Sequence, residues 1–247
     1  MIVQIYAITS VDEALALAGL GVDHIGFVAG VYGQVHGELT FAQAQAIAKA
    51  LKGKATSSAL TMSVDIAEIE RMVKAVQPDI VHISSDMEAV GIKSLATLRH
   101  TLPAEVLIMK AVSVNGPETI QAALQYGSIA DILLLDTKVT GMPGVGATGV
   151  VHDWTISQQI IKQINLRPDQ AKVILAGGLT PQNVAAAIRT TQPWGVDSNT
   201  GTNIPGDPLR KELNQVRKFV EQAKSCKISW DVKGMAISDR EPLSNFT

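Results

Sequence analysis

The chain has 247 residues, of which 46% are hydrophobic, and a formal net charge of −2 at pH 7. This length and apolar content suffice for one large core, while the scattered Lys and Arg residues lack the clustered basic face of a nucleic-acid-binding surface. A single cysteine, Cys226, excludes an intrachain disulfide and favours a cytoplasmic location. Residues 1–8 form a short apolar run without a basic leader, so we expect a first strand there and no signal peptide or membrane span.

Apolar runs of strand length alternate with segments of helical periodicity along the chain. The expected strands are, in chain order, residues 2–8, 24–29, 56–62, 80–84, 106–114, 131–137, 172–179 and 195–200. Among the expected helices, residues 41–52 and 66–76 have the clearest amphipathic spacing. This succession of βα units predicts an α/β fold, a single (β/α)8 TIM barrel over residues 1–226 with a short C-terminal extension at 227–247.

Residues 138–153 interrupt the alternation with a long, glycine-rich loop. A loop of this length is unusual between a strand and a helix, so it is a candidate lid or binding loop. Residues 144–149 match the GxGxxG pattern of dinucleotide-binding sites, but they lie several residues beyond their strand, and no following strand carries a ribose-binding acid at the right distance. We therefore expect no dinucleotide here.

Two strand ends in the last part of the barrel are rich in glycine and small polar residues. Gly177 and Gly178 follow the seventh expected strand, while Asn199, Thr200 and Gly201 lie at the end of the eighth. Such turns expose backbone N–H groups that bind anions, and the loops after strands seven and eight often hold phosphate in barrel enzymes. The sequence therefore predicts a phosphorylated small molecule bound by these residues.

Several motifs occur in an order that matches one enzyme family. They are VILAGGLTPQNV at residues 173–184, LLLD at 133–136, GATG at 146–149 ahead of DW at 153–154, IYAIT at 5–9 and GVD at 195–197. With these residues, and over nearly the whole barrel from residue 2 to about 224, the chain resembles the phosphoribosylanthranilate isomerase family of tryptophan biosynthesis. The resemblance implies a (β/α)8 barrel with its site at the C-terminal ends of the strands, and phosphate held by Gly177, Gly178 and the loop 199–201.

The family reaction that the resemblance implies is an Amadori rearrangement of a phosphorylated sugar, which needs no cofactor. An acid protonates the ring oxygen to open the furanose, and a base then removes the C2 proton on the way to the ketose. Asp136 retains the position of the acid. The family's first strand ends in a Lys-Ile-Cys-Gly-Ile-Thr type of sequence, whereas residues 4–9 read QIYAIT, so Tyr6 stands where the base cysteine is expected.

The missing cysteine leaves the identity of the base open. An unperturbed phenol has a pKa near 10, so Tyr6 is a weak base at neutral pH, and lining the pocket is its alternative role. His82 on the fourth strand has a better suited pKa, and a hydrogen-bonded core histidine is the alternative there. We expect Asp136, together with His82 or Tyr6, as the catalytic residues.

Other departures fall on the half of the site that would hold the anthranilate. Residues 33–38 read GQVHGE where the family has a Ser-Pro-Arg type of sequence, Ser113 stands for an arginine, and residues 82–85 read HISS in place of Gln-Leu-His-Gly. Asn199 and Thr200 replace two serines but keep the polar character of the phosphate loop. These departures predict a related phosphorylated substrate or an altered base.

Two further charged residues, Lys110 and Asp197, lie near strand ends. Lys110 is a candidate for a Schiff base, or for an ion pair with a carboxylate such as Asp136. Asp197 is expected to order its turn, because its charge would repel a bound phosphate.

Two pairs of polar residues lie in loops after expected strands. His36 and Glu38 follow the second strand, and His152 and Asp153 lie in the long loop after the sixth. Neither pair has the spacing of a recognised metal site, so we expect solvated loop residues and no bound metal.

These observations leave three functions open. The first is a phosphosugar isomerase, the second is a phosphosugar-binding or regulatory barrel without proton transfer, and the third is a lyase that depends on Lys110. Each would bind a phosphorylated small molecule as a monomer or homodimer, with no nucleic acid or membrane as partner.

Overall fold

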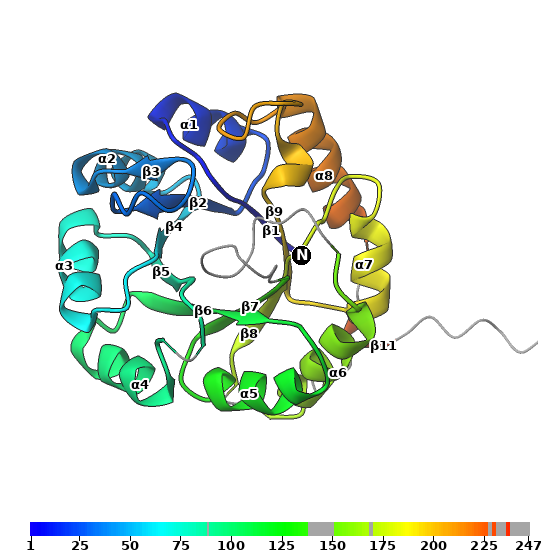
Figure 1. Cartoon of the computed structure of the whole chain (residues 1–247). Helices are drawn as coiled ribbons and strands as arrows, with labels where there is room; N and C mark the ends of the chain where they lie inside the picture. Colours follow the sequence, from blue (N-terminus) through cyan, green and yellow to red (C-terminus); the bar gives the residue numbers. More distant parts are fainter. Residues whose placement is uncertain (88, 138–150, 168–169, 227–228, 231–235, 238–247) are drawn as a thin grey trace, which may run out of the picture.

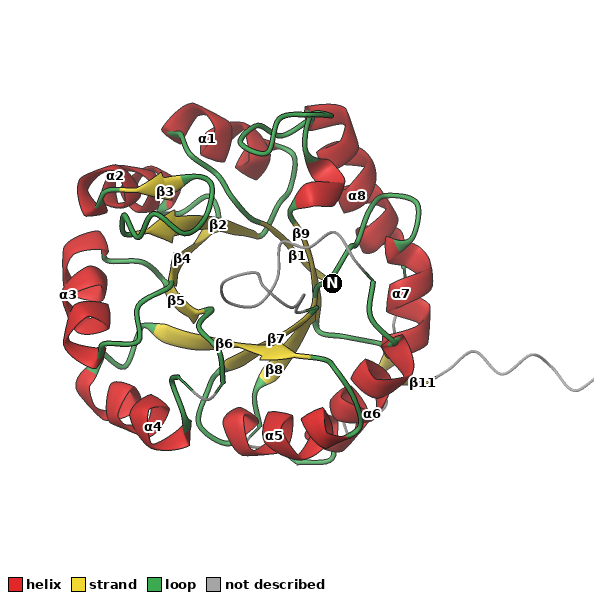
Figure 2. Cartoon of the chain, viewed as in Figure 1, coloured by secondary structure: helices red, strands yellow, loops and turns green. Residues whose placement is uncertain are grey.

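The computed structural model describes residues 1–87, 89–137, 151–167, 170–226, 229–230 and 236–237. The elements within these residues are, in chain order, β1 (Ile2–Ile5), α1 (Val11–Gly19), β2 (His24–Ala29), β3 (Glu38–Leu39), α2 (Phe41–Leu51), β4 (Thr56–Thr61), α3 (Ile66–Val76), β5 (Ile80–Ile83), α4 (Ile92–Thr101), β6 (Leu107–Ser113), α5 (Glu118–Gly127), β7 (Ile132–Asp136), α6 (Trp154–Asn165), β8 (Lys172–Leu175), α7 (Val184–Thr191), β9 (Gly195–Ser198), the 3-10 helix η1 (Thr200–Thr202), α8 (Leu213–Ser225), β10 (Ser229–Trp230) and β11 (Ala236–Ile237). The strands β1, β2 and β4 to β9 form a parallel sheet that closes because β1 pairs with both β9 and β2, while β3 pairs with the last two residues of β2. The expected (β/α)8 barrel is confirmed, with the helices on its outer side (Figure 1 and Figure 2).

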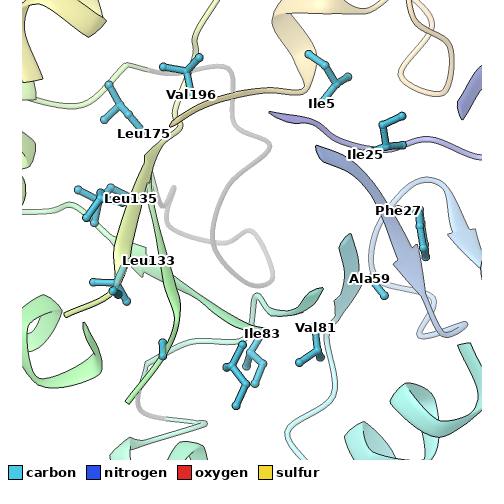
Figure 3. Close-up of a cluster of buried hydrophobic side chains, with 14 of the residues drawn as sticks. Ile5, Ile25, Phe27, Ala59, Val81, Ile83, Leu133, Leu135, Leu175 and Val196 are labelled. Atoms are coloured by element: carbon cyan, nitrogen blue, oxygen red, sulfur yellow. The ribbon is translucent and has the colours of Figure 1, made fainter. Parts of the chain in front are cut away.

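The main hydrophobic core lies between the ring of strands and the helices. Figure 3 shows side chains that point outward from successive strands, and the following are fully buried: Ile5, Ile25, Phe27, Ala59, Val81, Ile83, Leu133, Leu135, Leu175 and Val196. Alternate strand residues face the barrel axis, where Ile80, Met109 and Ile132 belong to a smaller apolar cluster. Both faces of the strands are covered, which explains why they read as nearly continuous hydrophobic runs.

The helices each bury one apolar face against the strands. Elements α2 and α3 confirm the two helices whose amphipathic spacing was clearest. The buried residues of α3 are Ile69, Met72, Val73 and Val76. Side-chain caps determine where both helices begin, since Thr40 accepts a hydrogen bond from the Gln43 N–H and Asp65 accepts one from the Ala67 N–H.

Two strands end three or more residues earlier than the sequence predicts. β1 ends at Ile5 and β8 ends at Leu175, three and four residues before their expected ends. The cause is local backbone conformation, because φ is +64° at Ala7, +86° at Gly177 and +62° at Gly178. The apolar pattern continues past these points into loops that turn at the barrel mouth, and this makes the strands look longer in the sequence.

Two parts of the sequence-based prediction lie outside the described residues. Segment 138–150, which contains most of the expected binding loop and its GxGxxG pattern, is one of them. Most of 227–247 is the other, apart from the antiparallel pair β10 and β11, so the domain boundary after residue 226 stays a prediction. None of the described helices is long and apolar enough to cross a membrane.

Candidate active site

Two adjoining cavities lie at the C-terminal ends of the barrel strands. The larger, here called the mouth cavity, has a volume of about 90 Å³ and is lined by Tyr6, Ala7, Val28, Val35, His36, Leu60, Met62, His82, Ser84, Leu134, Asp136, Asp197 and Asn199. The smaller, here called the glycine cavity, has a volume of about 20 Å³ and is lined by Asp136, Gly177, Gly178, Leu179, Asp197, Ser198, Asn199 and Thr200. Asp136, Asp197 and Asn199 line both cavities and therefore stand between them.

The glycine cavity brings together four of the five residues that the sequence assigns to phosphate binding, namely Gly177, Gly178, Asn199 and Thr200. A Cβ atom at Gly177 would lie 2.6 Å from Oγ1 of Thr137, so the backbone follows this path only with glycine there. Gly201, the fifth residue, does not line the cavity, and a Cβ atom there would collide with the main-chain carbonyl of Leu179. Gly201 therefore allows the loops after β8 and β9 to approach each other closely.

Hydrogen bonds fix the loop after β8, and this loop and the one after β9 each present a backbone N–H group that no described residue accepts. Asn183 accepts a hydrogen bond from the Thr180 N–H at 2.8 Å and donates one to the Gly178 carbonyl at 3.0 Å. Among the described residues, no hydrogen bond uses the backbone N–H of Gly178 or Thr200. Both donors are thus available to an anion such as a phosphate group.

Asp136 is the last residue of β7 and is 6% exposed. Its Oδ1 atom accepts a hydrogen bond of 2.7 Å from the N–H of Thr137. Burial raises the pKa of Asp136 to about 6, and this hydrogen bond opposes the shift. A carboxyl group in this state changes its protonation near neutral pH, as an acid or base in catalysis must.

Asp197 lies on β9 and is also 6% exposed. Its Oδ1 atom accepts a hydrogen bond of 3.1 Å from Nε2 of Gln4. Burial, and then the negative charge of Asp136, raise the pKa of Asp197 to about 8. Asp197 was expected only to order a turn, but it also lines both cavities. The sequence contains a signal for this role, since Asp197 lies near the C-terminal end of an expected strand just as Asp136 does.

Tyr6 and His82 meet inside the barrel, and both line the mouth cavity. The Tyr6 hydroxyl lies 2.7 Å from Nδ1 of His82 and 2.7 Å from Oγ of Ser58. Burial, and then the charge of Lys110, lower the pKa of His82 to about 3, whereas burial holds the pKa of Tyr6 well above its ordinary value. Both side chains are therefore neutral over the physiological pH range, and neither is a strong base there.

His36 and Glu38 belong to the connection between β2 and α2. His36 is exposed and lines the mouth cavity. The Glu38 carboxylate accepts hydrogen bonds from four successive backbone N–H groups, those of residues 32–35, at 2.7 to 3.0 Å. Glu38 therefore shapes the loop that carries His36 and is more than a solvated residue.

His152 was expected to be solvated, and this expectation was wrong. Its Nδ1 atom lies 3.1 Å from Oγ1 of Thr137, and its Nε2 atom lies 2.7 Å from Oγ of Ser157. Burial lowers the pKa of His152 to about 4, so the ring is neutral and joins the end of β7 to α6. Asp153 is exposed and caps α6 through the Thr155 N–H. Within the described part of the chain, no group of three His, Cys, Asp or Glu residues could hold a metal ion.

Lys110 does not pair with Asp136, contrary to one of the sequence-based alternatives. Its Nζ atom donates to the main-chain carbonyls of Ser85 and Ile83, and it lies 5.9 Å from the ring centroid of Tyr126 on α5. The side chain therefore lies on the outer, helix-facing side of β6, away from both cavities. This position offers no support for a Schiff base with a ligand at the barrel mouth.

The family model described as N-(5'-phosphoribosyl)anthranilate (PRA) isomerase matches residues 6–222. The chain belongs to this family. The resemblance found in the sequence motifs is thereby confirmed.

Named relatives in the phosphoribosylanthranilate isomerase family match nearly the whole chain. The N-(5'-phosphoribosyl)anthranilate isomerase 2 of Methanosarcina mazei is 35% identical over 91% of this chain and 95% of its own length. The N-(5'-phosphoribosyl)anthranilate isomerase of Methanocella arvoryzae is 32% identical over 91% of this chain and 99% of its own length.

Solved structures agree with this assignment at the level of the fold. Phosphoribosyl anthranilate isomerase from Thermotoga maritima matches with a TM-score of 0.71 and 25% identity, over 91% of this chain and 100% of that chain. The enzyme from Thermus thermophilus matches with a TM-score of 0.74 and 22% identity, over 92% of this chain and 100% of that chain. The barrel is therefore the fold of the family.

Proposed function

We propose that this protein isomerises a phosphoribosylated arylamine of the phosphoribosylanthranilate type by an Amadori rearrangement at the barrel mouth. The observation that carries the proposal is the pair of buried carboxyl groups, Asp136 and Asp197, between the two cavities. Family membership supports it, as does a related structure whose bound ligand is reduced 1-(o-carboxyphenylamino)-1-deoxyribulose 5-phosphate (TM-score 0.69, 24% identity).

The phosphate group anchors the substrate at the glycine cavity. The unused N–H groups of Gly178 and Thr200 bind its oxygens, and the side chain of Asn199 lies on the same wall. From there the sugar extends toward the mouth cavity, so that it passes between Asp136 and Asp197. The arylamine then occupies the mouth cavity, where Val28, Leu60 and other apolar side chains surround it.

The two carboxyl groups act as one unit that holds a single proton between about pH 6 and about pH 8. The protonated member donates to the furanose ring oxygen, the C1–O bond breaks, and the nitrogen lone pair forms an iminium group. The ionised member removes the C2 proton, and the electron pair of that C–H bond forms the C1–C2 double bond of an enolamine. Transfer of a proton from the C2 hydroxyl to C1 gives the ketose, so the reaction consumes no cofactor.

This assignment gives Tyr6 and His82 a different role from the base considered in the sequence analysis. The low pKa of His82 and the high pKa of Tyr6 make Asp136 and Asp197 the better acid and base near pH 7. Tyr6 and His82 instead line the mouth cavity as a hydrogen-bonded pair.

Turnover of phosphoribosylanthranilate, followed by the loss of anthranilate fluorescence, tests this proposal. We expect Asp136→Asn and Asp197→Asn each to lower kcat by about 100-fold or more, the scale of a lost acid or base. Tyr6→Phe and His82→Asn serve as matched variants in the same cavity, and we expect them to keep kcat within about 10-fold, because they remove hydrogen bonds but neither carboxyl group.

Two outcomes would contradict the proposal. A wild-type protein that binds inorganic phosphate but does not turn over the substrate would favour a phosphosugar-binding or regulatory barrel. Turnover that survives Asp197→Asn but is lost in His82→Asn would return the role of base to the histidine.

A further inference from the structure

Lys211 is a buried cation next to the glycine cavity. It lies between η1 and α8 and is 4% exposed. Its Nζ atom donates to the main-chain carbonyl of Asn199 at 3.0 Å, to Oδ1 of Asn199 at 2.9 Å, and to Oδ1 of Asn203. One side chain thus ties the start of η1 to the segment that leads into α8.

The acceptors of the Lys211 ammonium are all neutral. None of the ion pairs among the described residues includes Lys211. Burial lowers the pKa of Lys211 to about 8, and the nearby carboxyl groups of Asp197 and Glu13 oppose this shift. The Glu13 side chain accepts a hydrogen bond from the main-chain N–H of Lys211 at 2.8 Å. A buried ammonium bound only to neutral oxygens is costly unless a further negative charge lies close by. A phosphate dianion in the glycine cavity supplies such a charge.

Lys211 also determines how Asn199 faces the ligand. An ammonium group only donates hydrogen bonds, so it fixes the Oδ1 atom of Asn199 toward Lys211 and turns the Nδ2 atom away from it. The main chain of Asn199 has φ −116° and ψ −81°, outside the common regions, and the Lys211 bond to its carbonyl helps to hold this conformation. Asn199 lines both cavities, and Lys211 leaves its side-chain N–H donors free for a ligand there.

We propose that Lys211 is a positioning residue for phosphate recognition, which holds the Asn199 amide from beneath the loop and presents it to a phosphate dianion. The proposal rests on the phosphate-binding part of the proposed function and does not depend on which sugar carries the phosphate. A sugar phosphate and free phosphate share the dianion chemistry, so inorganic phosphate serves as the probe.

Calorimetric titration with inorganic phosphate tests this role on the full-length protein. We expect Lys211→Met to raise the Kd for phosphate at least 10-fold. Lys224→Met is the matched control, because Lys224 also donates to a main-chain carbonyl, that of Gly21, and lies near a carboxylate, that of Asp23. Its side chain is outside both cavities, and we expect its Kd to stay within 2-fold of the wild-type value.

A double-mutant cycle separates positioning from general support of the fold. If Lys211 acts through Asn199, then Asn199→Ala already removes most of its effect, and Lys211→Met adds less than 3-fold to the Kd on that background. Losses that multiply in the double mutant would overturn the proposal, and so would a folded Lys211→Met protein with the wild-type Kd.

Asn199→Asp provides a readout that survives if Lys211→Met does not fold. The new carboxylate keeps the hydrogen bond to Lys211 and neutralises its charge, so we expect an unchanged or higher Tm together with a Kd at least 10-fold higher. Wild-type phosphate affinity in this variant would overturn the proposal.

Kinetics distinguish a failure of this inference from a failure of the proposed reaction. If wild-type protein isomerises phosphoribosylanthranilate, we expect Lys211→Met to raise KM at least 10-fold while kcat changes less than 3-fold. An unchanged KM would contradict the positioning role of Lys211 and leave the proposed isomerase activity unaffected. If the protein shows no turnover but its phosphate binding depends on Lys211, the positioning role of Lys211 is supported and the proposed isomerase activity is contradicted.

Discussion

The carboxyl groups of Asp136 and Asp197 show how strongly the barrel changes the chemistry of single residues. In water both would be ionised near pH 7, because an unperturbed aspartate has a pKa near 4. Burial at the mouth raises the pKa of Asp136 to about 6, and burial together with the charge of Asp136 raises that of Asp197 to about 8. The pair therefore retains one proton at the pH where an acid and a base are both needed.

This arrangement predicts a bell-shaped pH profile of kcat/KM with limbs near pH 6 and pH 8. Below the lower limb both carboxyl groups are protonated and the base is lost, whereas above the upper limb both are ionised and the acid is lost. Steady-state rates between about pH 5 and pH 9.5 measure the profile. We expect the alkaline limb to disappear from the residual activity of Asp197→Asn, and a flat wild-type profile would contradict the assignment.

Gly177 and Gly206 form a matched pair for testing the phosphate loop. Both have positive φ, +86° and +81°, but a Cβ atom at Gly206 has nothing within 4 Å, whereas one at Gly177 would meet Thr137 at 2.6 Å. We expect Gly206→Ala to lower the free energy of unfolding by about 1 kcal/mol, the cost of left-handed backbone. Gly177→Ala should cost about 1 to 3 kcal/mol more because of the collision. Urea unfolding curves measure both, and equal costs would contradict the steric argument.

At the scale of elements, the connection from β2 to α2 is organised by a single side chain. The Glu38 carboxylate, in β3, binds the N–H groups of residues 32–35, and the Tyr32 hydroxyl lies 2.8 Å from Oγ1 of Thr61 on β4. These bonds hold Val35 and His36 against the mouth cavity. Residues 30–37 thus form a wall of the site without any regular secondary structure of their own.

We expect Glu38→Ala to loosen this wall while the barrel stays folded. Amide hydrogen exchange at residues 32–35 should become at least about 10-fold faster, since each lost hydrogen bond contributes about 1 kcal/mol or more. KM should rise by several-fold with the Tm nearly unchanged. Glu105→Ala, an exposed position outside both cavities, is the control, and unchanged exchange at 32–35 in Glu38→Ala would show that the carboxylate does not organise the loop.

At the scale of the whole molecule, the core between the strands and the helices is apolar, whereas the space inside the ring of strands is partly polar. Inside it, Gln4 donates to Asp197 at 3.1 Å, and its Oε1 atom lies 3.4 Å from Nδ1 of His24. Buried ionisable groups such as Asp197 and His24 lower the free energy of unfolding whenever they carry a charge that no partner compensates. The free energy of unfolding should therefore depend on pH through these interior groups.

The direction of this dependence follows from the raised pKa of Asp197. The folded protein holds the proton up to about pH 8, whereas the unfolded chain loses it near the ordinary aspartate pKa of 3.8. Asp197 by itself therefore makes the free energy of unfolding fall as the pH rises from about 4 to about 8. Burial lowers the pKa of His24 and His152 to about 4 and that of His82 to about 3, and these groups act in the opposite direction up to about pH 6.5. The net fall is thus expected between about pH 6.5 and pH 8. We expect Asp197→Asn to flatten this slope and to be more stable than the wild type at pH 8, by at least about 1 kcal/mol.

Urea unfolding at about pH 6.5 and pH 8 measures this effect. Asp207→Asn is the surface control, because exposed Asp207 pairs with Arg210 and has a lowered pKa, so the slope of the wild type should remain. Identical pH dependences for the wild type and Asp197→Asn would show that Asp197 is not a buried acid.

The architecture and the general place of the site could be read from the chain before folding was considered. Parallel strands buried on both faces are continuous apolar runs, and amphipathic helices repeat every 3.6 residues, so both patterns are local. Glycines and small polar residues at strand ends mark the proposed phosphate loops for the same reason. Strand ends were less accurate, because the turns at Ala7 and Gly177 depend on φ, which the apolar pattern does not record.

The partners of individual side chains required the folded barrel. An all-apolar strand does not reveal which alternate residues face inward, and a shift of one residue exchanges the two faces. Lys110 consequently faces α5 and not the cavity, while Asp197 joins Asp136, 61 positions before it in the chain. Lys211 and Asn199 are likewise brought together by η1 and the turn before α8. Local periodicity specifies the elements, whereas the curvature and closure of the sheet bring distant charges close enough to change one another's pKa.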